Sequence, residues 1–360
     1  MKKALLQIGV LVAAVCIAGA FSGCTKSRQM SVPKFKMITT ENLHGVMAPD
    51  EKNIWVVGAN GTIFHSADGG ENWKEQKSGV NWLLADGVFV NNKEGWVAGL
   101  SGTVLHTSDA GETWVTQKTG TDKHLFSVSF VDSKNGWAIG EWNTIIHTAD
   151  GGKTWQPQSE EGDKVLNNVL FTDAQNGLVV GEQGIILKTT DGGKTWEQII
   201  PAFFQRATLE EELEKPRPAL FGIFAIDKNN IFLCGIDGTI LRTADAGATW
   251  EQCNTDVKMG IYTISVKGNM GWGVGDKGTY IVSTDGGKTW KKQDDVIKTK
   301  VWLRDVVFVT PENGWALGST GTVVHTKDGG KTWEFFSGFS YAMEFFTMPK
   351  ALEFKEMVFE

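Results

Sequence analysis

Along most of the chain, short stretches of alternating apolar and polar residues are separated by turn-forming residues. In residues 125–158 an apolar stretch at 125–131 precedes an Asn-Gly turn, and two further stretches follow at 137–140 and 144–147. Alternation with a period of two, bounded by Gly, Asn and Asp, predicts β-strands joined by tight turns. A last strand begins at Trp155, so we expect a unit of four short antiparallel strands.

One eight-residue motif, [Ser/Thr]-x-Asp-[Gly/Ala]-Gly-x-x-Trp, follows the third strand of each unit and occurs seven times. Its aspartates are Asp68, Asp109, Asp150, Asp191, Asp245, Asp285 and Asp328. The spacing is 40 to 43 residues, except for one longer step between the fourth and fifth copies. Repeats of this length are typical of propellers and solenoids. Seven such units predict an all-β fold, a seven-bladed β-propeller of four-stranded antiparallel blades.

We interpret the motif as a structural turn. Its Asp carboxylate can accept backbone N–H groups within the turn, and its Gly residues can adopt positive φ. The Trp that follows can pack its indole over the turn. Four copies contain Gly-Gly-Lys-Thr, but they lack the upstream Gly of a phosphate-binding loop and precede a strand instead of a helix. Nucleotide binding is therefore not expected.

Cysteines and histidines also follow the repeat. Cys234 and Cys253 fall on the second and fourth strands of one unit, about 9.5 Å apart by strand spacing. This separation is too large for a disulfide, so both are expected to be free buried thiols. Four histidines stand three residues before the motif Asp, namely His65, His106, His147 and His325. Equivalent positions lie around the ring and do not converge, so we expect a packing or surface role, with no metal site and no cofactor.

Two parts of the chain depart from the repeat, which we expect to span residues 34–338. Residues 198–219 form an insertion with a short helix in it, and a loop of this length is either a tolerated surface insertion or a binding element. Residues 34–38 could add a strand beside the last blade. The tail 339–360 ends in a segment similar to the first strand of a blade. It could be a vestigial repeat, an extra strand or a cap, and the sequence leaves these alternatives open.

The N-terminus has the features of an export signal. Two lysines precede an apolar stretch at 4–20, and Ser22-Gly23 precede Cys24. This arrangement predicts a signal peptide at 1–23 and resembles a bacterial lipobox, with Cys24 as the lipidated residue. An uncleaved signal anchor is the alternative, because the apolar stretch is nearly long enough to span a bilayer. Residues 24–33 would be a polar tether. We expect an exported lipoprotein, anchored in the membrane and facing the periplasm from the outer membrane.

Charge limits the classes of partner. The 360 residues carry a formal net charge of −7, and two of the positive charges lie in the leader. Non-specific binding of nucleic acid requires a basic face, so no nucleic-acid partner is expected.

The motif resembles the Asp-box, or BNR, repeat of sialidases, xyloglucanases, sortilin-type receptors and photosystem II assembly factors. Sialidases need a cluster of arginines and a Tyr nucleophile with an acidic partner. Only five arginines occur here, and two of them, Arg242 and Arg304, fall on blades. Xyloglucanase-type enzymes use carboxylates from two propellers, whereas one is predicted here. Asp86 and Asp305, each third in a first strand, could form an acid–base pair or solvate the central channel. We predict no catalytic residue.

The run Gly-Trp-x-x-Gly-x-x-Gly-Thr-[Ile/Val]-x-x-[Ser/Thr]-x-Asp-Gly-Gly-x-Thr-Trp most resembles the photosystem II stability/assembly factor family, over about residues 40–338. Members are seven-bladed propellers, often lipoproteins, that help to assemble membrane complexes without catalysis. The resemblance implies a scaffold that binds a protein partner in a membrane or envelope complex. The alternative is a carbohydrate-active or sugar-binding propeller of the Asp-box type.

The candidate partner-binding residues lie where the turns between second and third strands and the links between blades share one face. Trp142 stands at the tip of a two-residue turn, where an indole has little local core to join. Phe203, Phe204 and Arg206 lie in the insertion, and Trp302 precedes a first strand. Exposed aromatic residues with an Arg are typical of protein-binding hot spots. In the alternative, Trp142 folds onto a neighbouring blade and the insertion is inert.

Overall fold

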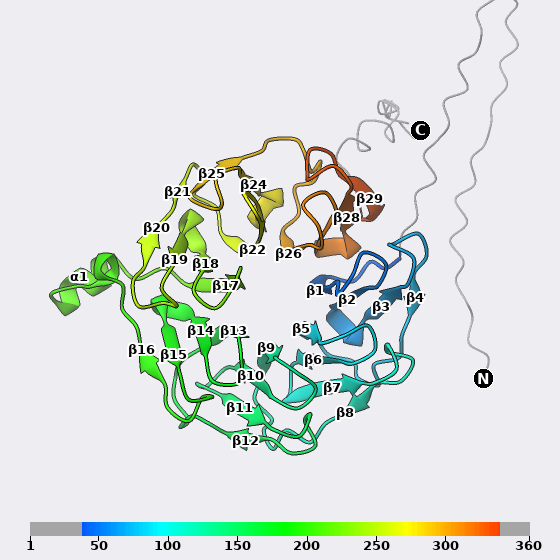
Figure 1. Cartoon of the computed structure of the whole chain (residues 1–360), viewed down its shortest axis with the longest axis horizontal. Coiled ribbons are helices and arrows are strands. Elements are labelled where there is room, and N and C mark those ends of the chain that lie inside the picture. Colours follow the sequence, from blue (N-terminus) through cyan, green and yellow to red (C-terminus); the bar gives the residue numbers. More distant parts are fainter. Residues whose placement is uncertain (1–37, 339–360) are drawn as a thin grey trace, which may run out of the picture. The chain divides into compact units, whose positions relative to one another are not determined.

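Residues 38–338 are described in the computed structural model of the protein, and they form seven β-sheets arranged in a ring (Figure 1). The prediction of a seven-bladed propeller with antiparallel four-stranded blades is confirmed. One blade has an additional outer strand, because β21 pairs in parallel with β25 and so links the fifth blade to the sixth.

The strands of the seven blades are as follows. Blade 1 contains β1 (Leu43–Met47), β2 (Ile54–Gly58), β3 (Ile63–Ser66) and β4 (Lys74–Glu75), and blade 2 contains β5 (Leu84–Phe89), β6 (Gly95–Gly99), β7 (Thr103–Thr107) and β8 (Val115–Thr116). Blade 3 contains β9 (Leu125–Phe130), β10 (Gly136–Gly140), β11 (Ile145–Thr148) and β12 (Gln156–Pro157), and blade 4 contains β13 (Leu166–Phe171), β14 (Gly177–Gly181), β15 (Ile186–Thr189) and β16 (Glu197–Gln198). Blade 5 contains β17 (Leu220–Ala225), β18 (Ile231–Gly235), β19 (Ile240–Thr243) and β20 (Glu251–Gln252). Blade 6 contains β21 (Asn254–Thr255), β22 (Ile261–Lys267), β23 (Met270–Gly275), β24 (Tyr280–Ser283) and β25 (Thr289–Lys292), and blade 7 contains β26 (Leu303–Phe308), β27 (Gly314–Gly318), β28 (Val323–Thr326) and β29 (Glu334–Ser337).

Helical structure is limited to short segments. Five single 3₁₀ turns follow second strands, at η1 (Ala59–Gly61), η2 (Glu182–Gly184), η4 (Ile236–Gly238), η5 (Asp276–Gly278) and η6 (Ser319–Gly321). The insertion contains η3 (Ala202–Phe204) and α1 (Leu209–Glu214), and α1 projects from the outer edge of the ring (Figure 1). Thr208 caps α1 by accepting a hydrogen bond from the Glu211 backbone N–H. Within residues 38–338 no helix has the length and apolar character needed to cross a membrane.

The ring has two faces of different construction. We call one the mouth face; it carries the turns between second and third strands and the links from each blade to the next. These parts are joined there, for example by the hydrogen bonds from Gly102 N to Lys123 O and from Asn143 N to Lys164 O. The other, the Asp-box face, carries the seven motif turns and the turns between first and second strands.

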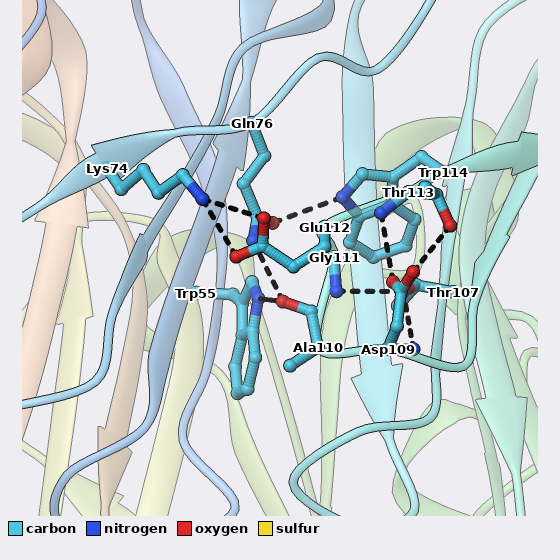
Figure 2. A network of polar contacts seen from close by, with 10 residues as sticks. All are labelled: Trp55, Lys74, Gln76, Thr107, Asp109, Ala110, Gly111, Glu112, Thr113 and Trp114. Atoms are coloured by element: carbon cyan, nitrogen blue, oxygen red, sulfur yellow. Dashed lines mark hydrogen bonds and ion pairs between the residues drawn. The ribbon is translucent and has the colours of Figure 1, made fainter.

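The motif turns owe their geometry to two side chains each (Figure 2). Asp109 accepts hydrogen bonds from the backbone N–H and the hydroxyl of Thr113, at 2.9 and 2.7 Å. The buried hydroxyl of Thr107 accepts from Gly111 N at 2.8 Å and donates to Asp109. The corresponding contacts recur in all seven turns, where each motif aspartate accepts the backbone N–H of the residue four positions later.

Neighbouring blades are held together by stacked aromatic rings. Trp55 of blade 1 lies between His65 of its own blade and Phe89 of blade 2, with ring centroids 4.0 and 3.9 Å away. Its indole N–H donates to the Ala110 carbonyl in the motif turn of blade 2 (Figure 2). The repeated histidines thus pack against tryptophans, and burial lowers the pKa of His65. The packing role expected for these histidines is confirmed.

The inner strands, which are the first strands of the blades, are also joined by side chains. Asp305 accepts a hydrogen bond from Val46 N at 2.9 Å and connects the last blade to the first. The Ser127 hydroxyl donates a hydrogen bond to Asp86 at 2.6 Å. The same hydroxyl accepts a hydrogen bond from the backbone N–H of Val169 at 3.3 Å. These residues therefore satisfy backbone N–H groups on the unpaired edges of the inner strands.

The ring is closed by the segment that precedes β1. Gly321 N donates to Glu41 O at 2.9 Å. The equivalent glycine of blade 1, Gly61, donates in the same way to the link between blades 1 and 2. Asn42 Oδ1 accepts from Thr320 N at 2.9 Å. Among residues 38–338, blade 7 contains no strand from the N-terminal side. The possible strand at 34–38 falls almost wholly outside the described residues, as do the tail 339–360 and Cys24.

Candidate functional site

The mouth of the ring, on the mouth face, is shaped by a bulge at the same place in every inner strand. The first residue of each inner strand is fully buried, and the pairing register shifts between it and the third residue. Such a bulge leaves the second residue unpaired and re-aims its side chain. The seven second residues are His44, Ala85, Phe126, Asn167, Phe221, Tyr262 and Arg304.

Six of these residues line one cavity of about 370 Å³, together with Leu83, Val165 and Trp302. The Trp302 ring lies 5.4 Å from that of His44, and the Phe221 ring lies 5.4 Å from that of Tyr262. The Arg304 guanidinium stands 5.0 Å above the Tyr262 ring, a cation–π arrangement. The mouth is therefore a bowl with aromatic walls and one cationic group.

The titratable groups of the bowl are mostly neutral. Burial, together with the charge of Arg304, lowers the pKa of His44 to about 4. Burial and a short hydrogen bond to Asp276 raise the pKa of Tyr262 to about 12. At neutral pH the imidazole and the phenol are both uncharged, so Arg304 is the positive group that a ligand in the bowl would meet.

Two carboxylates lie below the bowl but are already engaged as links between blades. Burial, followed by the charge of nearby Asp86, raises the pKa of Asp305 to about 7. Burial raises the pKa of Asp86 as well. Both Asp305 oxygens accept backbone N–H groups, from Val46 and Val306. This geometry assigns the pair to the joining of inner strands. Among residues 38–338, no cluster of three His, Cys, Asp or Glu side chains could hold a metal ion.

The rim of the mouth face carries the other aromatic residues singled out from the sequence. Trp142 is 50% exposed, and the Lys123 ammonium group lies 5.4 Å from its ring centroid. Its φ of +56° is costly for a bulky side chain. Trp142 therefore does not fold into the core of a neighbouring blade. Trp302, by contrast, belongs to the wall of the bowl.

The insertion corrects part of the predicted surface. Phe203 is 36% exposed, but Phe204 is 6% exposed and packs in a core cluster with Leu178 and Leu220. Phe204 therefore anchors the insertion and is not available to a partner. The Arg206 side chain donates to the carbonyls of Phe203, Gln205 and Lys215 within the insertion. Its guanidinium stabilises the loop itself, because each of these contacts is local.

Sequence reasoning missed most of the bowl. It treated the third residue of each inner strand as the lining, whereas the bulge presents the second residue at the mouth. The sequence did contain a sign of this. The second positions of the inner strands include His, Phe, Phe, Tyr and Arg, whereas the third positions hold small or polar residues. The two cysteines were predicted correctly: Cys234 and Cys253 are both free and buried. Burial raises the pKa of each thiol to about 12.

Comparisons with known proteins agree with this architecture. The chain resembles the solved structure "YCF48 bound to D1 peptide" with a TM-score of 0.65 and 22% identity, covering 81% of this chain and 93% of that one. YCF48 from Cyanidioschyzon merolae gives a TM-score of 0.64 and 20% identity, covering 81% and 97%. An ancestral GH74 enzyme gives 0.65 and 14%, covering 82% of this chain and 46% of the enzyme. At these identities the likenesses show the fold alone.

A family model supplies a more specific assignment. No curated protein matches the chain. The model described as "Photosynthesis system II assembly factor YCF48" matches residues 25–118, 113–202 and 208–296. These matches cover well over half of the chain, and the protein therefore belongs to the family of the photosynthesis system II assembly factor YCF48.

Proposed function

We propose that this protein is a non-enzymatic assembly or stability factor, which binds a segment of a partner polypeptide at the mouth face. The observation that carries the proposal is the bowl of about 370 Å³, walled by aromatic residues around one Arg. Aromatic side chains and Arg are the residues most enriched at the energetic centres of protein interfaces. A relative of known structure, YCF48, was solved with a D1 peptide bound, which supports a polypeptide ligand for this family.

We also propose that the protein acts at a membrane. Lipidation at Cys24 would hold the ring on a membrane through the tether 24–33, so the partner would be a subunit of a membrane or envelope complex. The bowl accepts a chain segment and not a whole domain, because its volume is that of a few side chains. The rim residue Trp142 and the exposed part of the insertion would contact the flanking residues of the partner.

Catalysis is not part of the proposal. The channel carboxylates are engaged by backbone N–H groups, and the neutral His44 and Tyr262 have no nucleophile between them. The carbohydrate alternative has support only from a fold shared with a GH74 enzyme. A glycan array and a panel of glycosidase substrates test it directly. Binding or turnover that is abolished by changes in the bowl would replace the present proposal.

The test of partner binding compares single substitutions on the two faces. Wild type and variants are immobilised, and proteins from solubilised envelope membranes are recovered and quantified by mass spectrometry. Trp302→Ala and Phe126→Ala should each reduce recovery of the same partner about tenfold or more, because they remove walls of the bowl. Ile226→Ala is the matched control, since Ile226 is 48% exposed on the Asp-box face. Equal recovery by all three folded variants would place the binding surface elsewhere.

A further inference from the structure

The seven junctions between blades are not equivalent, and at one of them both members of the stacked Trp–Phe pair are replaced by smaller residues. At junctions 1/2, 2/3 and 3/4 a Trp at the start of the second strand stacks on a Phe of the next blade. The pairs are Trp55–Phe89, Trp96–Phe130 and Trp137–Phe171, with centroid distances of 3.9, 3.7 and 3.5 Å. Each indole also donates to a carbonyl of the next motif turn, as Figure 2 shows for Trp55 and Ala110.

At junction 4/5 the corresponding side chains are smaller or charged. Leu178 stands in place of the Trp, Ala225 in place of the Phe, and Lys188 in place of the stacked His. The carbonyl of Ala246 is equivalent to those that accept the indole N–H elsewhere, and no indole reaches it here. Removing this much side-chain volume from a repeated interface leaves a void unless the neighbours move in.

The void is present as an open cavity of about 230 Å³ on the Asp-box face. Its floor is apolar and includes Leu170, Leu178 and Ile231. Its rim contains the side chains of Lys188 and Lys228, with Asn229 beside them. The site thus combines an apolar floor with two cationic groups at its rim.

Neither lysine is neutralised by an ion pair within the described part of the chain. Lys188 lies opposite Glu197 in the sheet, as Arg242 lies opposite Glu251 in blade 5, but only the arginine forms an ion pair with its neighbour. Asp173 and Asp227 lie near Lys228 but accept hydrogen bonds from amide groups of their own turns. These hydrogen bonds, and to a smaller extent the charge of Lys228, lower the pKa of both carboxyl groups. Neither ammonium group is therefore in direct contact with a carboxylate of the described residues, and each can approach an anion in the cavity.

The size of the cavity selects the ligand class. An engineered protein cavity of about 150 Å³ binds benzene, so the present volume accommodates an aromatic ring system with a substituent. We propose that junction 4/5 binds a small aromatic carboxylate, with its ring on Leu178 and its carboxylate at Lys188 and Lys228. The site is on the opposite face from the bowl and is independent of the partner-binding proposal.

The test uses indole-3-acetate as the probe, with indole and acetate as separate controls. Titration calorimetry on the full chain should detect saturable binding of indole-3-acetate at millimolar concentrations or below, and weaker binding of both controls. Lys188→Met and Lys228→Met should each weaken the affinity by about tenfold, because each removes a charged partner of the carboxylate. Lys134→Met, in the corresponding turn of blade 3 beside a filled junction, should leave the affinity unchanged.

A second pair of substitutions tests the cavity itself. Leu178→Trp with Ala225→Phe rebuilds the stack seen at junctions 1/2, 2/3 and 3/4, so it should abolish binding and raise the melting temperature. If the rebuilt protein fails to fold, the lysine variants still decide the question. The proposal is overturned if wild type shows no saturable binding, or if the Lys188→Met and Lys228→Met proteins bind as wild type does. Equal binding of inorganic phosphate and indole-3-acetate would overturn the aromatic part of the assignment.

Discussion

At the scale of single residues, Asp305 has the clearest consequence for stability. Its carboxylate joins β26 to β1 across the point where the ring closes. Burial raises its pKa from 3.8 to about 7, and the charge of Asp86 contributes to the shift. A carboxyl group with a raised pKa in the folded protein stabilises the fold below its unfolded pKa. That contribution is lost as the pH rises through the folded value.

Asp305→Asn should therefore flatten the pH dependence of unfolding. For wild type, the free energy of unfolding should decrease by roughly 4 kcal/mol between about pH 4 and pH 8, because each unit of pKa difference between the folded and unfolded protein is worth about 1.4 kcal/mol. The asparagine keeps one acceptor oxygen for the Val46 N–H and does not titrate. Urea unfolding across this range measures both proteins. Parallel curves for the two would show that Asp305 does not titrate as described.

At the scale of elements, the motif turn is stabilised by more than its aspartate. The sequence indicated the Asp carboxylate and the Gly conformations, and both are present. The structure adds the Ser or Thr hydroxyl at the first position, which is buried and accepts the N–H of the residue four positions later in all seven turns. The aspartates themselves lie at the surface. The hydrogen bonds that Asp150 accepts, first of all from the Thr154 backbone N–H, lower its pKa to about 2.

Thr107→Val tests the hydroxyl in one turn. The change keeps the shape of the side chain but leaves the Gly111 N–H without its acceptor in a buried position. We expect a loss of about 1–3 kcal/mol in the free energy of unfolding, the usual penalty for an unsatisfied buried donor. Chemical denaturation measures it, and Thr116→Val on the exposed strand β8 is the control. A loss no larger than that of the control would assign the turn to its aspartate and glycines alone.

The sequence predicted the blades well because their signals are local and repeated. Strand alternation, Gly-bounded turns and the motif each recur seven times, so single exceptions do not change the interpretation. The bowl was missed because an inner-strand bulge moves Phe126 and Arg304 to the mouth, and a bulge has no signal in the period of two. The cavity at junction 4/5 depends on Leu178 and Ala225 together, which are far apart in the chain and pair only in the ring.

At the scale of the whole molecule, we propose separate roles for the two faces. The bowl opens on the mouth face, and the cavity at junction 4/5 opens on the Asp-box face. A ligand of one face therefore need not compete with a ligand of the other. The proposed anchor at Cys24 precedes the ring by a short tether, so it would keep the ring near the membrane surface.

The anchor leads to a prediction about the mature N-terminus. Cleavage before Cys24 and acylation of that residue should be found by mass spectrometry of the protein isolated from its own membranes. Cys24→Ser should shift the protein from the membrane fraction to the soluble fraction. An intact leader on the native protein, or unchanged fractionation of the Cys24→Ser protein, would contradict lipid anchoring.

Photo-crosslinking from the wall of the bowl shows whether a segment of a partner polypeptide binds there. A photoreactive phenylalanine analogue replaces Trp302 in one protein and Ile226, on the opposite face, in another, and both are irradiated in intact envelope membranes. We expect one dominant adduct from position 302, mapped by mass spectrometry to a short segment of one membrane-complex subunit, and none from position 226. The same adduct from both positions, or an adduct from position 226 alone, would contradict it.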